Sequence, residues 1–315
     1  MKAGRIALIA ALVLVAGLVP AATAAADQGP PLTVPAKELA ASLTCTADVD
    51  RAKRDPVLLF PAFSTAQESY GATYLKDLPK WGFPTCSITL ADRGYGDLQR
   101  AAEFAVYAIR TVSERSGRQV SVLGHQHGGI DWLLALRFWP DVPAKVSDYI
   151  SLAAPHHGTE VAATVCTTLR CSPSQWQIRT GSKLLTAVNR KPAPRGPSYT
   201  SISTAYDELI TPQPAASHML GARNIVLQDV CPGRLVEHFT ILVDPLTNQL
   251  VRDALEHPGP ADPSRLAKPC STSALGLPTL AGLPGLLGFG LRFTVNGVVA
   301  TVPSEPTLRP QFATG

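Results

Sequence analysis

Charged residues are scarce in this sequence, and neither sign dominates. Only 17% of the 315 residues are charged, 45% are hydrophobic, and the formal net charge is +4. Two positive charges, Lys2 and Arg5, lie in a segment that we expect to be removed, so the mature chain is close to neutral. This balance argues against nucleic-acid binding. The apolar content allows a large core, in one large α/β domain or two small ones.

The sequence also lacks a convincing membrane span. The apolar run at 6–19 follows Lys2 and Arg5 and precedes small residues at 22–26, which is the pattern of a secretory signal peptide over residues 1–26. A second apolar run, at 273–291, is interrupted by Gly and Pro, so we expect an apolar flap beside the functional site. These features predict a secreted, extracellular protein.

No cysteine spacing in the sequence resembles a metal knuckle, so we expect no metal site. An even number of cysteines in an exported chain favours disulfides instead. Six cysteines allow fifteen pairings, of which the simplest follows the order of the sequence. The cysteines are Cys45, Cys86, Cys166, Cys171, Cys231 and Cys270.

Short apolar segments alternate with helical ones, which predicts an α/β fold with a mostly parallel central sheet and helices on both faces. We expect this arrangement in a single domain over 27–315. Within it, 27–55 would form a polar surface arm, 160–198 a lid-side insertion, and 273–315 a C-terminal flap and tail. Strands are expected at 56–60, 86–90, 120–123, 146–153, 199–203 and 224–228. Helices are expected at 70–81, at 130–139, at 247–257, and from an N-cap at Asp97 to about Ser116.

The stretch V-S-V-L-G-H-Q-H-G-G at 120–129 has the layout of a nucleophile elbow, G-x-S-x-G, without its nucleophile. An apolar strand leads into a turn, and a helix-forming segment follows. Gly124 and Gly128 fill both glycine positions, where the strained central residue leaves no room for neighbouring Cβ atoms. The central residue is Gln126 and not serine.

Asp207 and His238 stand where the other members of a catalytic triad are expected, in the chain order nucleophile, acid, histidine. Each follows one of the later predicted strands. In such a pair the carboxylate fixes the imidazole tautomer and stabilises its charged form. Taken alone, however, Asp207 would more often be a turn or cap residue, and His238 a solvated loop residue.

Four further histidines lie near the predicted site. His125 and His127 could suggest a metal site, but no Cys or Asp cluster accompanies them, and their side chains should leave a tight turn in different directions. His156 and His157 follow a strand and are expected to pack in a loop near the mouth of the site. Trp132 and Trp139 are expected in the core.

Together these motifs resemble the secreted lipase B-type triacylglycerol lipases of fungi and their actinobacterial relatives, within the α/β-hydrolase superfamily. The resemblance covers nearly the whole mature chain. Its motifs are P-V-L-L-F-P at 56, G-H-x-x-G-G at 124, A-P-H-H-G-T at 154, S-P-S-Q-W-Q at 172, Y-D-E-L-I-T-P-Q at 206, E-H-F-T at 237 and S-E-P-T-L-R-P-Q-F at 304.

The resemblance implies a lipid or ester as the small-molecule partner, and neither a metal nor a cofactor. We expect a monomer that makes transient contact with lipid surfaces. The family's disulfides support the pairs Cys45–Cys86 and Cys231–Cys270, and the cysteine-bearing lid region of its bacterial branch supports Cys166–Cys171.

The chain departs from the family pattern at three positions of one site. The resemblance places the nucleophilic serine at Gln126, and the oxyanion-hole positions at His127 and Phe63, where the family has glutamine and threonine. A phenyl ring cannot replace the threonine hydroxyl, and an amide cannot carry an acyl group as an ester does. Ser64 and Ser121 are the candidate replacements, but Ser121 is expected to face a helix.

Three functions therefore compete. The chain could be a lipase-family protein without normal serine-esterase activity, which binds an acyl or apolar ligand or a partner. It could remain a carboxylic-ester hydrolase, with a displaced nucleophile such as Ser64 or with water activated by Asp207 and His238. The third hypothesis is a His–Asp dyad that serves a lyase or oxygenase, with Gln126 and His127 as polar substrate contacts.

Overall fold

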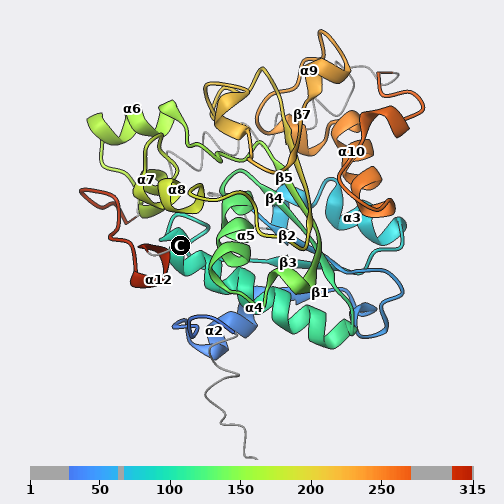
Figure 1. Cartoon of the computed structure of the whole chain (residues 1–315), viewed down its shortest axis with the longest axis horizontal. Helices are drawn as coiled ribbons and strands as arrows, with labels where there is room; N and C mark the ends of the chain where they lie inside the picture. Colours follow the sequence, from blue (N-terminus) through green and yellow to red (C-terminus); the bar gives the residue numbers. More distant parts are fainter. Residues whose placement is uncertain (1–27, 63–66, 271–299, 314–315) are drawn as a thin grey trace, which may run out of the picture.

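A seven-stranded sheet forms the centre of the molecule (Figure 1). The strand order is β1-β3-β2-β4-β5-β6-β7, with β1 antiparallel to β3 and all other neighbours parallel. The predicted fold class is thus confirmed. The strands are β1 (Leu43–Cys45), β2 (Val57–Phe60), β3 (Thr85–Ile88), β4 (Val120–His125), β5 (Val146–Leu152), β6 (Ser198–Ser203) and β7 (Arg223–Val226).

The computed structural model describes residues 28–62, 67–270 and 300–313. The predicted signal peptide, the apolar run at 273–291, Phe63 and Ser64 lie outside these ranges. In the described ranges, no helix has the length and apolar character needed to cross a bilayer.

Helices cover both faces of the sheet, so the central strands β2 and β4 are buried on both sides. Leu58 and Phe60 of β2 contact the apolar cluster under α4 (Leu98–Ser116) and α5 (His127–Phe138). The alternate residues of β2 contact the opposite cluster, with α3 (Tyr74–Lys80) and α10 (Pro245–Glu256). This alternation follows from the two-residue period of a strand. The remaining α-helices are α2 (Ala36–Ser42), α6 (Glu160–Thr168), α7 (Pro173–Gln177), α8 (Lys183–Val188), α9 (Leu227–Val230) and α12 (Pro310–Ala313).

Several local expectations are confirmed. The Asp97 side chain caps α4 by accepting a hydrogen bond from the Gln99 N–H, and Gly117 ends this helix in the left-handed conformation. Trp132 and Trp139 are fully buried. The last predicted strand is shorter than expected, because the chain turns into α9 after Val226.

The prediction of a polar surface arm over 27–55 is wrong. This segment forms α2, β1 and a short 3-10 helix, and it buries Val34, Leu39 and Val49 in the core. The disulfide Cys45–Cys86 joins β1 to β3. Each element is too short to give a clear hydrophobic period in the sequence, and the sheet edge supplies the partner that stabilises them.

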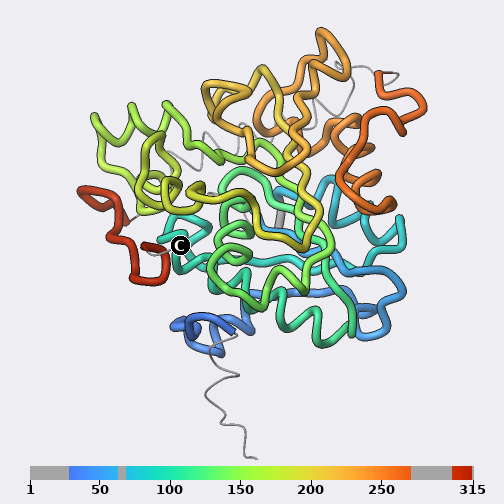
Figure 2. Tube along the Cα trace, in the orientation of Figure 1, coloured from blue at the N-terminus to red at the C-terminus, as the bar shows by residue number. Residues whose placement is uncertain are grey.

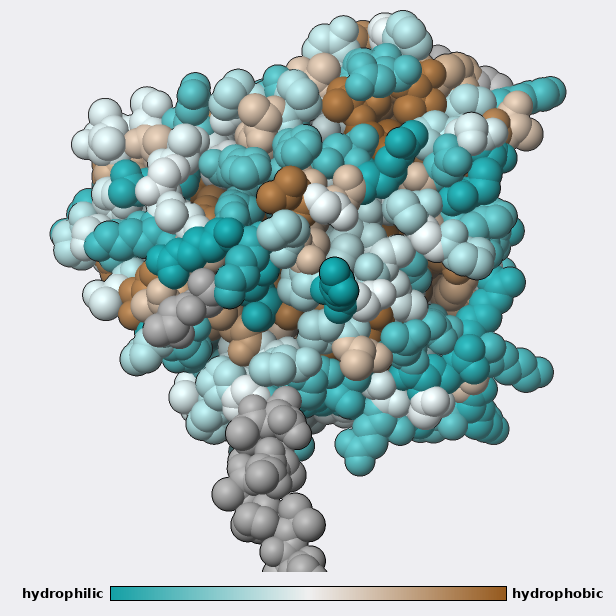
Figure 3. Space-filling view, in the orientation of Figure 1, coloured by the Kyte–Doolittle hydropathy of each residue, from teal (hydrophilic) through white to brown (hydrophobic). Residues whose placement is uncertain are grey.

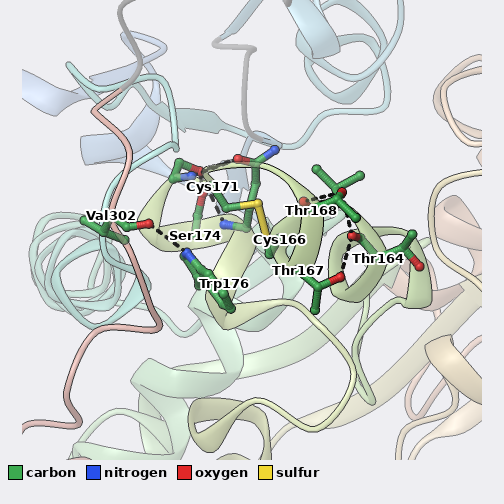
Figure 4. Close-up of a disulfide and its surroundings, with 11 residues drawn as sticks. Thr164, Cys166, Thr167, Thr168, Cys171, Ser174, Trp176 and Val302 are labelled. Carbon is green, nitrogen blue, oxygen red and sulfur yellow. Dashed lines mark hydrogen bonds between the residues drawn. A yellow bond between two sulfur atoms is a disulfide. The ribbon is translucent and has the colours of Figure 1, made fainter.

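The predicted lid-side insertion consists of α6, α7 and α8. The disulfide Cys166–Cys171 connects the end of α6 to the start of α7, and the C-terminal segment lies against it (Figures 2 and 4). Trp176 Nε1 donates a hydrogen bond to the Val302 carbonyl over 3.1 Å, and the Val302 N–H donates to the Cys171 carbonyl over 2.8 Å. With Cys231–Cys270 also formed, all three expected disulfides are confirmed.

The buried Glu103 of α4 holds both terminal segments of the described chain. Its carboxylate accepts hydrogen bonds from the N–H and hydroxyl of Thr33 and from the Val34 N–H. It also forms an ion pair with Arg309 of the C-terminal segment, at 2.6 Å. One side chain therefore satisfies groups from segments more than 200 positions apart in the sequence.

We expect Glu103→Ala to lower the free energy of unfolding by about 3 kcal/mol, because it leaves two backbone N–H groups and a guanidinium without their acceptor. Urea unfolding measures this change. The control is Glu38→Ala, which removes a partly exposed ion pair with Arg100 and should cost less than about 1 kcal/mol. Equal losses in the two variants would contradict the role given to Glu103.

Candidate functional site

The predicted site residues follow strands that end at one edge of the sheet. Because β2, β4 and β5 are parallel neighbours, the segments that begin at Pro61, Gln126 and Ala153 leave the sheet together. Asp207 follows β6, and His238 comes after β7 and α9. In open α/β sheets, ligands bind outside this carboxyl edge.

Gln126 occupies a strained turn between β4 and α5. Its backbone has φ 54° and ψ −128°, which a residue with a side chain rarely adopts. The flanking glycines are required, since a Cβ on Gly124 would lie 2.4 Å from the Gly128 carbonyl carbon, and one on Gly128 would lie 2.3 Å from the Phe60 oxygen. The steric reason expected for these glycines is therefore present.

Tyr70, which the sequence did not single out, links the two strands that lead into the site. Its hydroxyl donates to the Phe60 carbonyl over 2.7 Å and accepts from the His125 N–H over 2.9 Å. The side chain is fully buried, and burial raises the pKa of its hydroxyl far above the ordinary value, so the hydroxyl keeps its proton. A lone tyrosine at the start of a predicted helix carries no sequence signal for this contact.

The structure brings Asp207 and His238 together. His238 Nδ1 donates to the carboxylate, with distances of 3.1 and 3.0 Å to its two oxygens, and both side chains are buried. The Leu209 and Ile210 N–H groups hold Oδ1 of the same carboxylate. Burial alone would lower the pKa of His238, but Asp207, together with Glu208 and Glu237, raises it above the ordinary value. The arrangement can accept and hold a proton.

His125 and His127 have different partners, as the tight turn predicts. His125 Nε2 lies 3.0 Å from the His238 carbonyl oxygen, and its ring is tilted by 39° against the His238 ring, with 4.7 Å between the ring centroids. Burial, followed by the charge of His238, keeps the pKa of His125 well below its usual range. His127 begins α5 and pairs through Nδ1 with the buried Asp131, at 2.8 Å. Among the described residues, no group of three or more His, Cys, Asp or Glu side chains could hold a metal.

His156 and His157 differ in their surroundings. His156 is fully buried, and its Nε2 lies 3.1 Å from the Ser151 hydroxyl of β5. Burial, together with the nearby His157 and His218, lowers the pKa of His156 to about 3. His157 is exposed and stacks on His218.

Ser121, one of the two candidate replacements for the nucleophile, does not face a helix. Its hydroxyl contacts Asp148 and Ser147 of the neighbouring strand β5, at 3.0 Å from each side-chain oxygen. These contacts lie near the start of β4, at the opposite end of the strand from Gln126. The structure therefore separates Ser121 from the elbow.

Two buried polar atoms at the elbow stand out. Gln126 Oε1 and His238 Nε2 are both inaccessible to solvent and have no hydrogen-bond partner within the described part of the chain. Since an unsatisfied buried polar group costs about 1–3 kcal/mol, such atoms are commonly found where a ligand or water binds.

Acid should destabilise the protein partly through His156. The folded-state pKa of His156 is lowered from 6.5 to about 3. Below about pH 6.5 the imidazole is therefore protonated in the unfolded chain but stays neutral in the native state. We expect this group to cost about 2 kcal/mol between roughly pH 6.5 and pH 5. In urea unfolding across this range, His156→Gln should lose that part of the acid dependence, whereas Ser151→Ala should keep it. Parallel curves for the wild type and His156→Gln would contradict the assignment.

Comparisons with known proteins agree with this fold. Residues 137–240 match the family model described as Lipase (class 2). Lipase B of Pseudozyma antarctica is 28% identical over 235 residues, which are 72% of this chain and 69% of the relative. The crystal structure of Aspergillus fumigatus lipase B superposes with a TM-score of 0.81 at 25% identity, covering 90% of this chain and 73% of the other.

A more distant structure shows the fold alone. The mature lipase of Bacillus licheniformis is 16% identical, with a TM-score of 0.53 over 72% of this chain and 96% of its own. The resemblance found in the sequence is confirmed: the chain is a homologue of lipase B, with the α/β-hydrolase fold.

Proposed function

We propose that this chain is a secreted lipase-family protein that lacks normal serine-esterase activity and binds an acyl or other apolar ligand at the site around Gln126. The observation that carries the proposal is the identity of residue 126. A carboxamide stands on the strained turn of a nucleophile elbow, beside an Asp207–His238 pair with the geometry of a base and its orienting acid.

The chemistry of residue 126 explains the expected inactivity. A carboxamide has no hydroxyl to deprotonate and cannot form the acyl ester on which the two-step reaction depends. Loss of a serine nucleophile costs about 10⁶ in kcat in a serine protease. We assign the backbone N–H of His127 to the oxyanion-hole position at the start of α5, and Phe63 to the position where the family has a donating threonine.

Several features support an apolar ligand and an extracellular setting. The loops that carry Asp207 and His238 also expose Tyr206 and Leu235, each about half accessible. Figure 3 shows a largely polar face with one larger apolar patch at its top, over the segment around α9. The three disulfides favour an oxidising compartment. We propose a monomer without metal or cofactor that contacts lipid surfaces transiently.

A second candidate function has an observation of its own. The Asp207–His238 pair is intact, and the raised pKa of His238 suits a general base. Water activated by this pair could hydrolyse a carboxylic ester slowly without a covalent intermediate. This function predicts a low activity that depends on His238.

The decisive comparison is between the wild type and Gln126→Ser. We expect the wild type to hydrolyse nitrophenyl butyrate no faster than buffer alone does. A fluorophosphonate probe should not label it. Gln126→Ser should gain both labelling and turnover, because the glycine frame of the turn is present and the Asp207–His238 pair has the geometry of a base and its orienting acid.

The controls separate the two candidate functions. Gln126→Ser combined with His238→Ala should lose the gained activity. Wild-type hydrolysis that disappears in His238→Ala would favour activated water, and fluorophosphonate labelling of the wild type would refute the proposal by revealing another nucleophile. If Gln126→Ser is inactive, we would conclude that Ala62, Phe63 and His127 have closed the oxyanion hole.

A further inference from the structure

We infer that the ligand is a free carboxylic acid, whose carboxyl group binds between His238 and the first turn of α5. The inference rests on the proposed function, which gives the ligand its apolar chain. It adds the chemical class of the ligand's head group. An ester, the substrate class of a lipase, would be the weaker ligand.

The first observation is the unsatisfied edge of His238. Because Nδ1 is turned to Asp207, Nε2 lies on the edge of the ring away from that carboxylate, buried and without a partner in the described chain. The ring packs in a tilted arrangement against the ring of His125, the residue directly before Gln126. An oxygen that accepts a hydrogen bond from the charged imidazole, or donates one to the neutral ring, would satisfy this nitrogen.

The second observation is the start of α5. This helix has 12 residues, and its first turn contains no acidic side chain. The N-terminus of such a helix carries a partial positive charge that stabilises anions. Gln126 stands at its N-cap position with a buried oxygen that also has no partner in the described chain. Rotation of the amide would present its NH₂ group to a carboxylate, or its oxygen to a carboxylic acid.

The charged groups around His238 determine how many protons His238 and the ligand hold together. Asp207 bonds Nδ1 of His238, and a Glu208 oxygen accepts from the His238 N–H at 3.2 Å. Glu237 lies nearby but bonds the Phe239 and Thr240 N–H groups, and His125 faces the ring from β4. These carboxylates favour an imidazolium and disfavour a further uncompensated negative charge. One proton must therefore be shared between His238 and the ligand.

An ester does not meet these requirements. It has no ionisable proton, and its carbonyl oxygen carries only a partial charge, so it gains less from an imidazolium and a helix N-terminus than a carboxylate does. The site should thus prefer an acid over its methyl ester, although both present the same apolar chain.

Calorimetric titration of the full chain with octanoate and with methyl octanoate tests the inference. We expect the acid to bind at least about tenfold more tightly, as a charge-assisted hydrogen bond allows. The acid's affinity should fall about tenfold per pH unit above the pKa of His238, because binding then takes up a proton, whereas the ester's affinity should not follow this titration. These comparisons use the wild type alone and need no variant.

His238→Gln should bind the two ligands equally and lose the pH dependence, while Leu220→Ser, at an exposed position outside the loops that carry Asp207 and His238, should keep the preference for the acid. Equal wild-type affinities, or an acid affinity that follows the same pH profile in His238→Gln, would overturn the inference but leave the proposed apolar site standing. If neither ligand binds the wild type, both the proposed function and the inference fail.

Discussion

The close approach of three backbone segments at Gly124 and Gly128 is the constraint on which the site depends. The first turn of α5 lies so near the ends of β2 and β4 that a Cβ at either glycine would overlap with main-chain atoms. This contact forces the residue between them into a positive φ and places it at the carboxyl edge of the sheet. The geometry is independent of the chemistry of that residue, so a glutamine can occupy this turn without disturbing the fold.

Around this turn the buried polar groups fall into two classes. Most are paired: Tyr70 bridges the ends of β2 and β4, His127 bonds Asp131, and Asp207 accepts from His238 and two backbone N–H groups. These pairs hold the elbow rigidly. Exceptions near its centre, among the described residues, include Gln126 Oε1, His238 Nε2, His125 Nδ1 and Asp131 Oδ1. Buried polar atoms without a partner are uncommon in proteins, so their concentration beside this turn supports the proposal that a ligand binds there.

Sequence patterns predicted the central strands, the main helices and the order of the site residues. They succeeded where the signal was local and long, as in α4 with its Asp97 cap and Gly117 terminus. They failed for 27–55, because α2 and β1 are too short to show a period and depend on the sheet edge. Histidines were also hard to place. His156 and His157 are adjacent in sequence, yet one is a neutral core residue beside Ser151 and the other lies on the surface.

By itself, the sequence determined the fold class, the glycine frame of the elbow and the absence of a serine at its centre, because these depend on local backbone sterics and short-range periodicity. Only the tertiary structure decided which side chains meet. The contact of His238 with both Asp207 and His125, the Tyr70 bridge and the hold of Glu103 on both terminal segments join residues distant in the chain. Such contacts leave no periodic pattern in the sequence, since they form only when folding brings distant segments together.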